Sequence, residues 1–369
     1  MKKTARTAAV VGIAALVLAG CGSRPSDNEA SSNDTPTAAE TTSEAPAESH
    51  PDFKACEVSD SGGFDDKSFN QTSLKGLTDA KADLGVQTAQ VESNSDSEYA
   101  DNIDALVKQG CNSITTVGFL LGDATLAAAK KNPKIDFSIV DFAYDKAPKN
   151  LKGLTFNTAE PSFLAGYLAA AESESGILGT FGGLNIPTVS IFMEGFRQGV
   201  EQYNKDSGKS VKLLGWNGKD GSFLNTFDDK SKGQQVAEGM IQQGADIIFP
   251  VAGPAGLGGL QAAKDKGVHA IWVDTDGCIS AEEYCSVLMS SVEKGMDVAV
   301  KDAVISVVDN KFDNTQFTGT LQNGGTAIAP FHDFDSKVPA DVKSELDQIK
   351  ADIISGKIMI QSKVQPKAS

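Results

Sequence analysis

The stretch Asp60-Ser-Gly-Gly-Phe-Asp-Asp-Lys-Ser-Phe-Asn-Gln71 connects a strand-like run, Phe53–Val58, to a helix-like stretch, Ser68–Leu84. Gly62 and Gly63 at this strand-to-helix turn allow the backbone to approach a ligand closely. Carboxylates, amides and two phenylalanines surround them, a set that suits a small molecule with an aromatic face and several hydroxyl groups. The segment therefore predicts one wall of a ligand site.

The first residues have the features of an export signal. Met1–Gly20 has a basic start and then an apolar run, Ala8–Ala19, that is too short for a comfortable membrane span and is typical of a signal peptide. The run ends in Leu18-Ala-Gly-Cys21, which resembles the lipobox of bacterial lipoproteins, where the cysteine is acylated. The alternative is a chance cysteine after an ordinary signal peptide. We expect Cys21 to be lipidated, with palmitate-type chains anchoring the protein on the extracytoplasmic face of the cell membrane.

Residues 21–50 combine the lipidated cysteine with a segment rich in Ser, Thr, Ala, Pro and Glu, which predicts a disordered acidic tether. The whole chain has a net charge of −16, and −19 remains once the three basic residues of the signal are removed. This balance argues against nucleic acid, nucleotide polyphosphates or an anionic membrane surface as the main partner. An uncharged nucleoside or sugar stays compatible with it.

Four cysteines remain in the folded part when Cys21 is taken by lipid. An even number outside the cytoplasm favours disulfides. Cys56 and Cys111 lie at or near the starts of strand-like runs and could bridge neighbouring strands, and Cys278 and Cys285 would close a short loop. Metal binding is the alternative, but neither pair has CxxC spacing and no histidine is near in sequence.

Short β-branched runs alternate with helix-like segments throughout the chain, which predicts an α/β fold with parallel sheets and helices on both faces. Helical spacing marks Tyr99–Lys108, Ser190–Tyr203 and Gly295–Val308. The predicted strands are Phe53–Ser59, Gln87–Glu92, Ser113–Val117, Ile135–Phe142, Leu154–Asn157, Ile177–Phe181, Val211–Trp216, Asp246–Val251, Ala270–Asp274 and Ser286–Ser290.

The length after residue 50 suggests two lobes joined by a hinge of several chain crossings. Asn157–Pro161 is a plausible first crossing, because it ends a strand and opens a helix with proline at its start. Two more are expected near Thr275–Cys285 and Asp309–Phe317. Residues 51–158 with 277–312 would form the N-terminal lobe, and residues 159–276 with 313–369 the C-terminal lobe. Such a bilobed clamp can close around a small ligand.

The chain contains no HExxH, GxSxG or Walker-type GK[ST] motif, so we expect no catalytic residue and no cofactor. Gly253-Pro-Ala-Gly-Leu-Gly-Gly259 follows a predicted strand, but it has no lysine, and its proline argues against a phosphate loop. A glycine-rich strand end that lines a ligand cleft is the favoured interpretation. Asp274-Thr-Asp-Gly277 has the start of a calcium loop without the remaining ligand positions, so no metal site is expected.

Several predicted strands end in carboxylates or aromatic residues, which a ligand clamp needs. A carboxylate can accept hydrogen bonds from two vicinal hydroxyls of a ribose. Two residues keep alternatives: Asp66 could cap the helix that begins near Ser68 or touch the ligand, and Lys294 could be a solvated helix residue or part of the site. The candidate strand-end residues are Asp60, Phe119, Asp141, Asp274 and Asp276.

The opening segment, followed by Gly76-Leu77, resembles the signature of the basic membrane protein (PnrA-like) family, whose members are purine-nucleoside-binding lipoproteins of ABC importers. The resemblance continues through most of the chain to about Gly325. It implies a type I periplasmic-binding fold that captures a purine nucleoside (adenosine, guanosine or inosine class) without changing it, and it implies ABC permease and ATPase partners. Further matching segments are Gly182-Gly183, Gly195-Phe196, Gly244–Gly253, Gly256–Gly258, Val273–Asp276 and Ser290–Lys294.

By this resemblance Asp60 would contact the base, Phe69 would stack on it, Asn70 would support the pocket, and Asp141 would lie beside base or sugar. Asp274 or Asp276, together with Lys294, would hold the ribose hydroxyls. We expect a monomer that closes on its ligand and then meets a permease. A surface sensor for a sugar or other small molecule, and a nucleoside or sugar hydrolase, are the alternatives. The full predicted ligand-binding set is Asp60, Ser61, Phe69, Asn70, Phe119, Asp141, Gly253, Asp274, Asp276 and Lys294.

Overall fold

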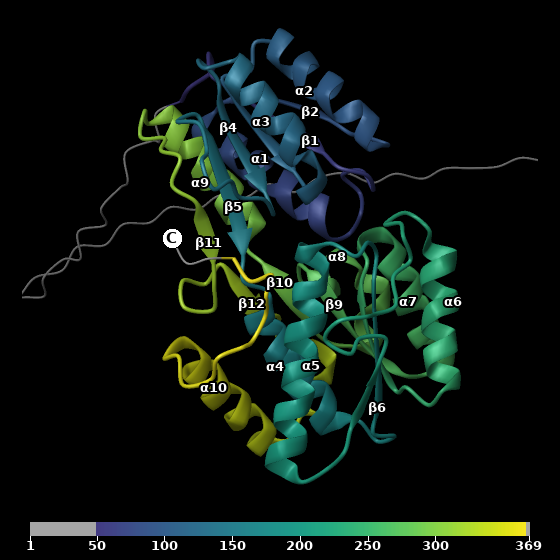
Figure 1. Ribbon diagram of the computed structural model, residues 1–369. Coiled ribbons are helices and arrows are strands. Elements are labelled where there is room, and N and C mark those ends of the chain that lie inside the picture. The colour runs from purple at the N-terminus through teal and green to yellow at the C-terminus, as the bar shows by residue number, and fades with distance from the viewer. Residues whose placement is uncertain (1–48, 367–369) are drawn as a thin grey trace, which may run out of the picture. The chain divides into compact units, whose positions relative to one another are not determined.

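Two six-stranded sheets form the framework of residues 49–366, which are the part of the chain that the computed structural model describes (Figure 1). The first sheet has the strand order β11-β5-β4-β3-β1-β2, and the second has the order β12-β10-β9-β8-β6-β7. Every pairing is parallel except that of β10 with β12, which is antiparallel. The predicted α/β fold with two parallel sheets is confirmed. The predicted signal peptide, lipidated Cys21 and most of the tether lie outside the described residues.

The strands and helices follow one another as the alternating pattern predicts. The strands are β1 (Lys54–Ser59), β2 (Gln87–Val91), β3 (Ser113–Val117), β4 (Asp136–Val140), β5 (Leu151–Phe156), β6 (Ile177–Gly182), β7 (Lys212–Leu214), β8 (Ile247–Val251), β9 (His269–Asp274), β10 (Leu288–Lys294), β11 (Phe317–Gly319) and β12 (Thr326–Ile328). The helices are α1 (Phe69–Leu84), α2 (Tyr99–Lys108), α3 (Gly122–Lys131), α4 (Ala159–Glu172), α5 (Pro187–Ser207), α6 (Lys230–Gln242), α7 (Gly253–Lys266), α8 (Gly277–Ser280), α9 (Met296–Val308) and α10 (Ala340–Ile354).

Helices cover both faces of the first sheet. On one face α1 and α9 pack against each other, and Val300 of α9 is buried with Val117 and Val140 of the sheet. On the other face Ile103 of α2 is buried in a cluster that includes Ile114 of β3. The strands of this sheet are short and rich in β-branched residues, as Ser113–Val117 of β3 is, and this composition made them visible in the sequence.

The second sheet is sandwiched in the same way. Helices α4 and α5 pack closely on one another, and Phe192 and Phe196 of α5 contact Phe249 of β8. Helices α6 and α7 are packed together, and Ala237 and Ala255 belong to a core cluster with Ile248 of β8. The helices cover the faces of both sheets and leave the carboxyl ends of the parallel strands uncovered. Ligands of such folds bind at these strand ends.

Two of the three predicted lobe crossings are wrong. The segment 277–287 does not return the chain to the first lobe: it forms α8 and a 3₁₀ turn, after which β10 pairs in parallel with β9 in the second sheet. The chain returns to the first lobe after β10, where α9 packs on α1. It crosses again after β11, which pairs with β5 in the first sheet, whereas β12 pairs with β10 in the second. The β11 and β12 strands are too short to give a sequence signal.

Both predicted disulfides are present. Cys56 of β1 is bonded to Cys111, which lies just before β3, and the two strands are neighbours in the first sheet. Cys278 of α8 is bonded to Cys285 and closes the excursion between β9 and β10. Each disulfide therefore joins segments of one lobe, the first at sheet one and the second at sheet two, and neither connects the two lobes.

Candidate functional site

A cleft lies between the strand ends of the two sheets. It contains about 600 Å³ of free space, including space open to solvent. The first sheet contributes residues that follow β1, β3 and β4, and the second contributes residues that end β8, β9 and β10. Nine of the ten predicted ligand-binding residues line this cleft: Asp60, Ser61, Phe69, Asn70, Phe119, Asp141, Gly253, Asp274 and Lys294.

Asp60 and Asn70 form a polar pair at one end of the cleft. Asn70 Nδ2 donates to Asp60 Oδ1 over 2.9 Å. Burial raises the pKa of Asp60 well above its usual range, and the nearby Asp66 and Asp141 carboxylates raise it further, although Asn70 opposes the shift. Gly118 allows this arrangement, because it has a φ of 120° and a Cβ there would lie 2.3 Å from Asp60 Oδ2.

The amide oxygen of Asn70 is the second notable group at this end. Asn70 is 1% exposed, and its Oδ1 has no hydrogen-bond partner among residues 49–366. A buried acceptor without a donor is costly, so such a group is commonly satisfied by a ligand or by water. The pair therefore offers one carboxyl group and one free acceptor to a ligand that carries N–H groups.

Lys294 occupies the middle of the cleft between carboxylates from both sheets. Its Nζ lies 2.6 Å from Asp141 Oδ2 and 3.5 Å from Asp274 Oδ1. Burial alone would lower the pKa of Lys294, but the two carboxylates outweigh it and raise that pKa. Lys294 therefore stays protonated at neutral pH. Burial raises the pKa of Asp141, and the Lys294 charge opposes that shift.

Asp141 and Asp274 occupy equivalent places in the two sheets. Asp141 follows the last residue of β4, and Asp274 ends β9. Both have positive φ values, 66° and 69°, which are uncommon for residues other than glycine. Backbone strain of this kind is concentrated at functional sites, where the surrounding structure holds it in place.

Two phenylalanine rings flank the Lys294 ammonium group. Its Nζ lies 4.9 Å from the ring centre of Phe69 on α1 and 5.0 Å from that of Phe192 on α5. Phe69 is on a helix that packs on the first sheet, Phe192 is on a helix that packs on the second, and both rings line the cleft. The arrangement provides apolar faces beside charged groups, which suits a ligand with a flat aromatic part and a hydroxylated part.

Sequence reasoning missed several cleft residues. Phe192 belongs to the predicted helix Ser190–Tyr203, where its spacing cannot be distinguished from that of core residues. Phe227 lies in an irregular segment between β7 and α6 that has no periodic pattern. The α5 N-terminus also lines the cleft with Ile186, Thr188 and Val189. The only sequence signal for this wall was the Gly182-Gly183 pair before the helix.

Asp66 caps α1, as the sequence analysis allowed. Its Oδ1 accepts hydrogen bonds from the backbone N–H groups of Ser68 and Gln71, and its Oδ2 accepts one from Asn70. Burial raises the pKa of Asp66 to about 6, and these N–H groups limit the shift. Asp65 is mostly exposed and pairs with Lys67 instead. These hydrogen bonds fix the start of the helix that carries Phe69 and Asn70, and Asp66 itself also borders the cleft.

Two hydrogen bonds join the lobes at the α1 end of the cleft. Ser68 Oγ donates to Asp274 Oδ2 over 2.7 Å, and Trp272 Nε1 donates to the Lys67 carbonyl oxygen over 3.1 Å. Both connect the opening segment of the first lobe to β9 of the second. The cleft therefore has a polar latch between its two walls, and the latch uses a carboxylate that also contacts Lys294.

The sequence comparison with protein-family models identifies a single family over nearly all of the folded part. Residues 53–363 match the Bmp family, described as "ABC transporter substrate-binding protein PnrA-like". The chain belongs to this family. The predicted family is thereby confirmed, and so is the prediction that the protein is not an enzyme, because the family consists of substrate-binding proteins of ABC transporters.

Similar proteins extend over the same region. The "ABC transporter nucleoside-binding protein BmpA" of Lactococcus lactis subsp. cremoris is 31% identical, and the match covers 98% of this chain and 100% of that relative. "Basic membrane protein A" of Borreliella burgdorferi is 31% identical, with 82% of this chain and 86% of the relative covered. A solute-binding protein from Aeropyrum pernix K1 has the same fold, with a TM-score of 0.75, 24% identity, and coverage of 83% of this chain and 92% of that one.

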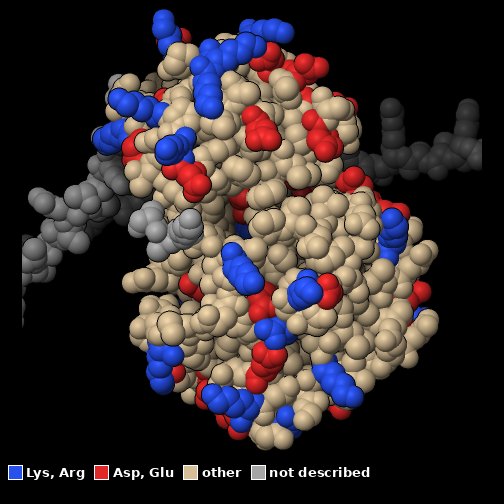
Figure 2. All heavy atoms as spheres, viewed as in Figure 1, with Lys and Arg blue, Asp and Glu red and all other residues tan. Residues whose placement is uncertain are grey.

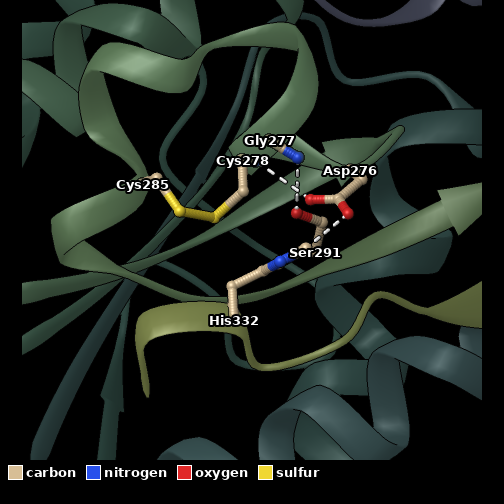
Figure 3. The surroundings of a disulfide bond; sticks show 6 residues. All are labelled: Asp276, Gly277, Cys278, Cys285, Ser291 and His332. Carbon is tan, nitrogen blue, oxygen red and sulfur yellow. Dashed lines mark hydrogen bonds and ion pairs between the residues drawn. A yellow bond between two sulfur atoms is a disulfide. The ribbon is translucent and has the colours of Figure 1, made fainter. Parts of the chain in front are cut away.

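Asp276 is the predicted ligand-binding residue that does not line the cleft of this Bmp-family structure. Figure 3 shows it beside the Cys278–Cys285 disulfide and His332. Asp276 Oδ1 accepts a hydrogen bond from Cys278 N at the start of α8, and Asp276 Oδ2 lies 2.6 Å from His332 Nε2. Asp276, Cys278 and His332 together offer donor atoms within 4.8 Å of one another. The Cys278 sulfur, however, is bonded to Cys285 and is not available as a thiolate ligand. Asp276 therefore caps a helix beside the disulfide.

The surface of the Bmp-family protein carries charges of both signs. Figure 2 shows acidic and basic residues interspersed on one face. Within residues 49–366, none of the helices combines the length and the apolar composition that crossing a bilayer requires.

Proposed function

We propose that this substrate-binding protein captures a purine nucleoside in its cleft and presents it, unchanged, to the permease and ATPase of an ABC importer. The observation that carries the proposal is the combination of two aromatic rings from opposite walls with the Lys294–Asp141–Asp274 group between the sheets. The name of the Lactococcus relative, a nucleoside-binding protein, supports the same ligand class.

The base occupies the end of the cleft near Asp60 and Asn70. Phe69 stacks on the ring, a contact worth about 1–3 kcal/mol in base–aromatic pairs. The free Oδ1 of Asn70 accepts a ring or exocyclic N–H group, and the Asp60 carboxyl group completes the recognition. A ligand that lacks these N–H groups leaves buried acceptors unpaired, which is the strongest source of discrimination.

The ribose lies beside Lys294. Its vicinal hydroxyls donate to the Asp141 and Asp274 carboxylates, and the ammonium group donates to a hydroxyl oxygen. Among the described residues that line the cleft, Lys294 is the only lysine or arginine, while Asp60, Asp66, Asp141 and Asp274 supply carboxyl groups. A phosphate group would meet excess negative charge, so the proposed ligand is the nucleoside and not its nucleotide.

Ligand binding favours closure of the lobes, because the ribose contacts Asp141 of the first lobe and both Asp274 and Lys294 of the second. The Ser68–Asp274 latch also forms only when the walls meet. The permease would recognise this closed form. Lipidation at Cys21 would keep the protein at the extracytoplasmic membrane face, where the permease lies. Mass spectrometry of the mature N-terminal peptide tests the anchor, and an unmodified cysteine there would contradict it.

Calorimetric titration tests the ligand. We expect inosine, guanosine or adenosine to bind, while ribose alone, free bases and AMP bind far more weakly. Incubation followed by chromatography should show the nucleoside intact, whereas released base would indicate a hydrolase. If only a sugar is recovered from gently purified protein, the nucleoside proposal is wrong.

A further inference from the structure

A second chamber adjoins the nucleoside cleft on the hinge side. It contains about 960 Å³ of free space, part of it open to solvent. Four residues line both spaces: Phe119, Asp141, Thr188 and Lys294. Two of the three residues proposed for the ribose, Asp141 and Lys294, therefore stand between the cleft and the chamber, while Asp60 and Asn70 at the base end do not line the chamber.

The walls of the chamber are largely apolar and aromatic. The loop after β4 supplies Phe142 and Tyr144, whose ring centres lie 4.8 Å apart, and Phe142 also contacts Phe119 at 5.2 Å. Tyr144 is held in place because its hydroxyl donates to the Gly122 carbonyl oxygen over 2.6 Å. Ile191 of α5 faces the chamber from the other lobe. These side chains suit an aliphatic or thioether group.

One buried hydroxyl in the wall lacks a partner. Thr158, at the first crossing between the lobes, is 0% exposed, and its Oγ1 has no hydrogen-bond partner among the described residues. Thr158 lines the chamber. Leaving this hydroxyl unpaired costs free energy, so Thr158 is a strained point in the chamber wall.

The charges of the chamber disfavour an anion. Lys294 is the only lysine or arginine among the described lining residues, and it already pairs with Asp141 and lies 3.5 Å from Asp274. Asp145 adds a further carboxylate. A phosphate or carboxylate group would therefore find no uncompensated positive charge.

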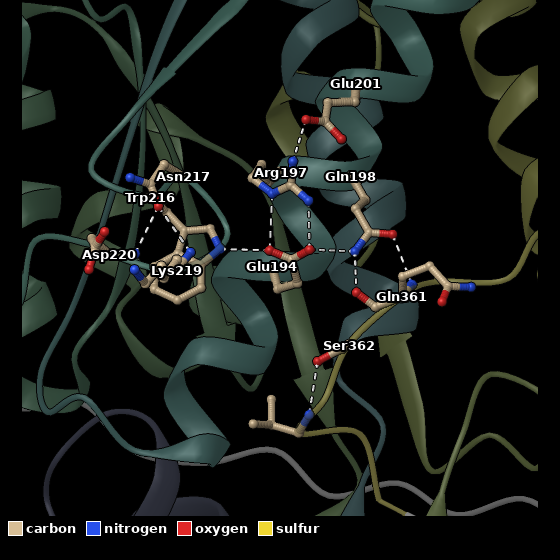
Figure 4. A network of polar contacts seen from close by, with 11 residues as sticks. Glu194, Arg197, Gln198, Glu201, Trp216, Asn217, Lys219, Asp220, Gln361 and Ser362 are labelled. Atoms are coloured by element: carbon tan, nitrogen blue, oxygen red, sulfur yellow. Dashed lines mark hydrogen bonds and ion pairs between the residues drawn. The ribbon is translucent and has the colours of Figure 1, made fainter.

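The C-terminal segment forms one side of the chamber. Val364 and Pro366 line it, and Gln365 Nε2 donates to Asn157 Oδ1 over 3.3 Å. Figure 4 shows how this segment is attached to α5: Gln198 donates to the Gln361 carbonyl oxygen, and Gln361 N donates back to Gln198 Oε1. Glu194 accepts from Gln198 and from Arg197, so the attachment belongs to a larger polar network.

We infer that the chamber receives a neutral, largely apolar substituent on the sugar of a nucleoside, so that the substrates include 5′-alkylthio nucleosides as well as unsubstituted ones. This inference rests on the proposed function. It goes further because it names a second subsite, on the ribose side of the cleft, and the chemical class of group that the subsite accepts.

The test compares ligands on the purified full chain in detergent. Adenosine, 5′-deoxy-5′-methylthioadenosine and its 5′-butylthio homologue are titrated by calorimetry, with AMP as the charged counterpart. We expect both thioethers to bind within about threefold of adenosine, and AMP to bind at least about a hundredfold more weakly. If adenosine binds but both thioethers are rejected by about a hundredfold, the inference is overturned while the proposed function stands.

A substitution that narrows the chamber tests whether the alkylthio group binds there. Ala143 lines the chamber, is exposed and does not line the cleft, so Ala143→Trp narrows the chamber at little risk to folding. We expect it to weaken the butylthio probe by about tenfold or more and to leave adenosine within about twofold. The matched control is Ala100→Trp, at an exposed position of α2, which should change neither titration. Equal losses for both ligands would overturn the chamber assignment, and failure of every nucleoside to bind would overturn the proposed function with it.

Discussion

The Lys294 Nζ atom lies 2.6 Å from Asp141 Oδ2, and this pair joins the last residue of β10 in the second sheet to the residue after β4 in the first. Both side chains are almost fully buried, with side-chain exposures of 4% and 6%. Replacing Lys294 by methionine should leave two carboxylates buried without their counter-charge. Breaking a buried ion pair by removing one partner costs about 3–5 kcal/mol. Urea denaturation should show this loss.

Two further variants make the Lys294 result specific. Adding Asp141→Asn to Lys294→Met removes one stranded charge and should restore part of the lost free energy of unfolding. Lys301→Met, which removes an exposed ion pair with Asp83, should leave the denaturation midpoint close to the original. An unchanged midpoint for Lys294→Met would contradict the structural importance of the buried pair.

Phe69→Ala should weaken nucleoside binding by tenfold or more, which corresponds to about 1.4 kcal/mol, because stacking on the base is lost. Calorimetric titration measures the change, and circular dichroism checks that the fold is intact. Phe53→Ala is the matched control, since Phe53 is partly buried before β1 and does not line the cleft. Equal affinities for the Phe69 variant and the original protein would remove Phe69 from the proposed base site.

Asp274→Ala should also weaken binding by about tenfold or more, because a ribose hydroxyl loses a charged acceptor. The same change breaks the bond from Ser68, so a second variant separates the two effects. Ser68→Ala removes the latch and keeps the carboxylate, and it should reduce affinity less than Asp274→Ala does. If the two variants lose affinity equally, Asp274 acts through the latch and not through the sugar.

The sequence predicted the positions of the strands better than the places where the chain crosses between the two lobes. Each predicted strand has a counterpart, because short runs of β-branched and apolar residues between helix-like segments can be recognised locally, but the chain crossings depend on tertiary pairing. The segment 277–287 could return to either lobe on local grounds, and only the pairing of β10 with β9 places it in the second. Three-residue strands such as β11 and β12 carry no pattern at all.

Cleft residues could be predicted where a polar or charged side chain directly follows a predicted parallel strand. A carboxylate directly after a buried parallel strand lies at the ligand edge, and this rule places Asp60, Asp141 and Asp274 in the cleft. Asp276 follows the same strand as Asp274 but turns into the α8 cap, because its side chain bonds Cys278 N. Phe192 could not be recognised, since a cleft phenylalanine and a core phenylalanine have the same helical spacing.

The Cys56–Cys111 disulfide should stabilise the first lobe without affecting the ligand. The bridged residues are 55 apart in sequence, and closing a loop of that size contributes about 4 kcal/mol in the chain-entropy description. Replacing both cysteines by alanine should therefore lower the melting temperature clearly. Affinity should stay the same, because neither cysteine lines the cleft. A parallel loss of affinity in the folded variant would show that the disulfide shapes the site.

Glu57 predicts how stability depends on pH. It is 0% exposed in β1, and burial raises its pKa from 4.5 to about 8, with the Ser73 hydroxyl opposing only part of the shift. The folded state therefore holds this proton more tightly than the unfolded state does. Its contribution to stability is largest below pH 4.5 and is lost as the pH rises toward 8, by up to about 1.4 kcal/mol per pH unit.

Glu57→Gln removes this titration, so the free energy of unfolding should fall less steeply between pH 5 and pH 8, where the buried group titrates. Urea denaturation at several pH values measures the slope, which is independent of any constant change in stability caused by the amide. Glu345→Gln, at an exposed position of α10, is the matched control and should keep the original slope. If Glu57→Gln keeps it too, the Glu57 carboxyl group is already ionised in the folded protein, and a cation or water within the first sheet must compensate its charge.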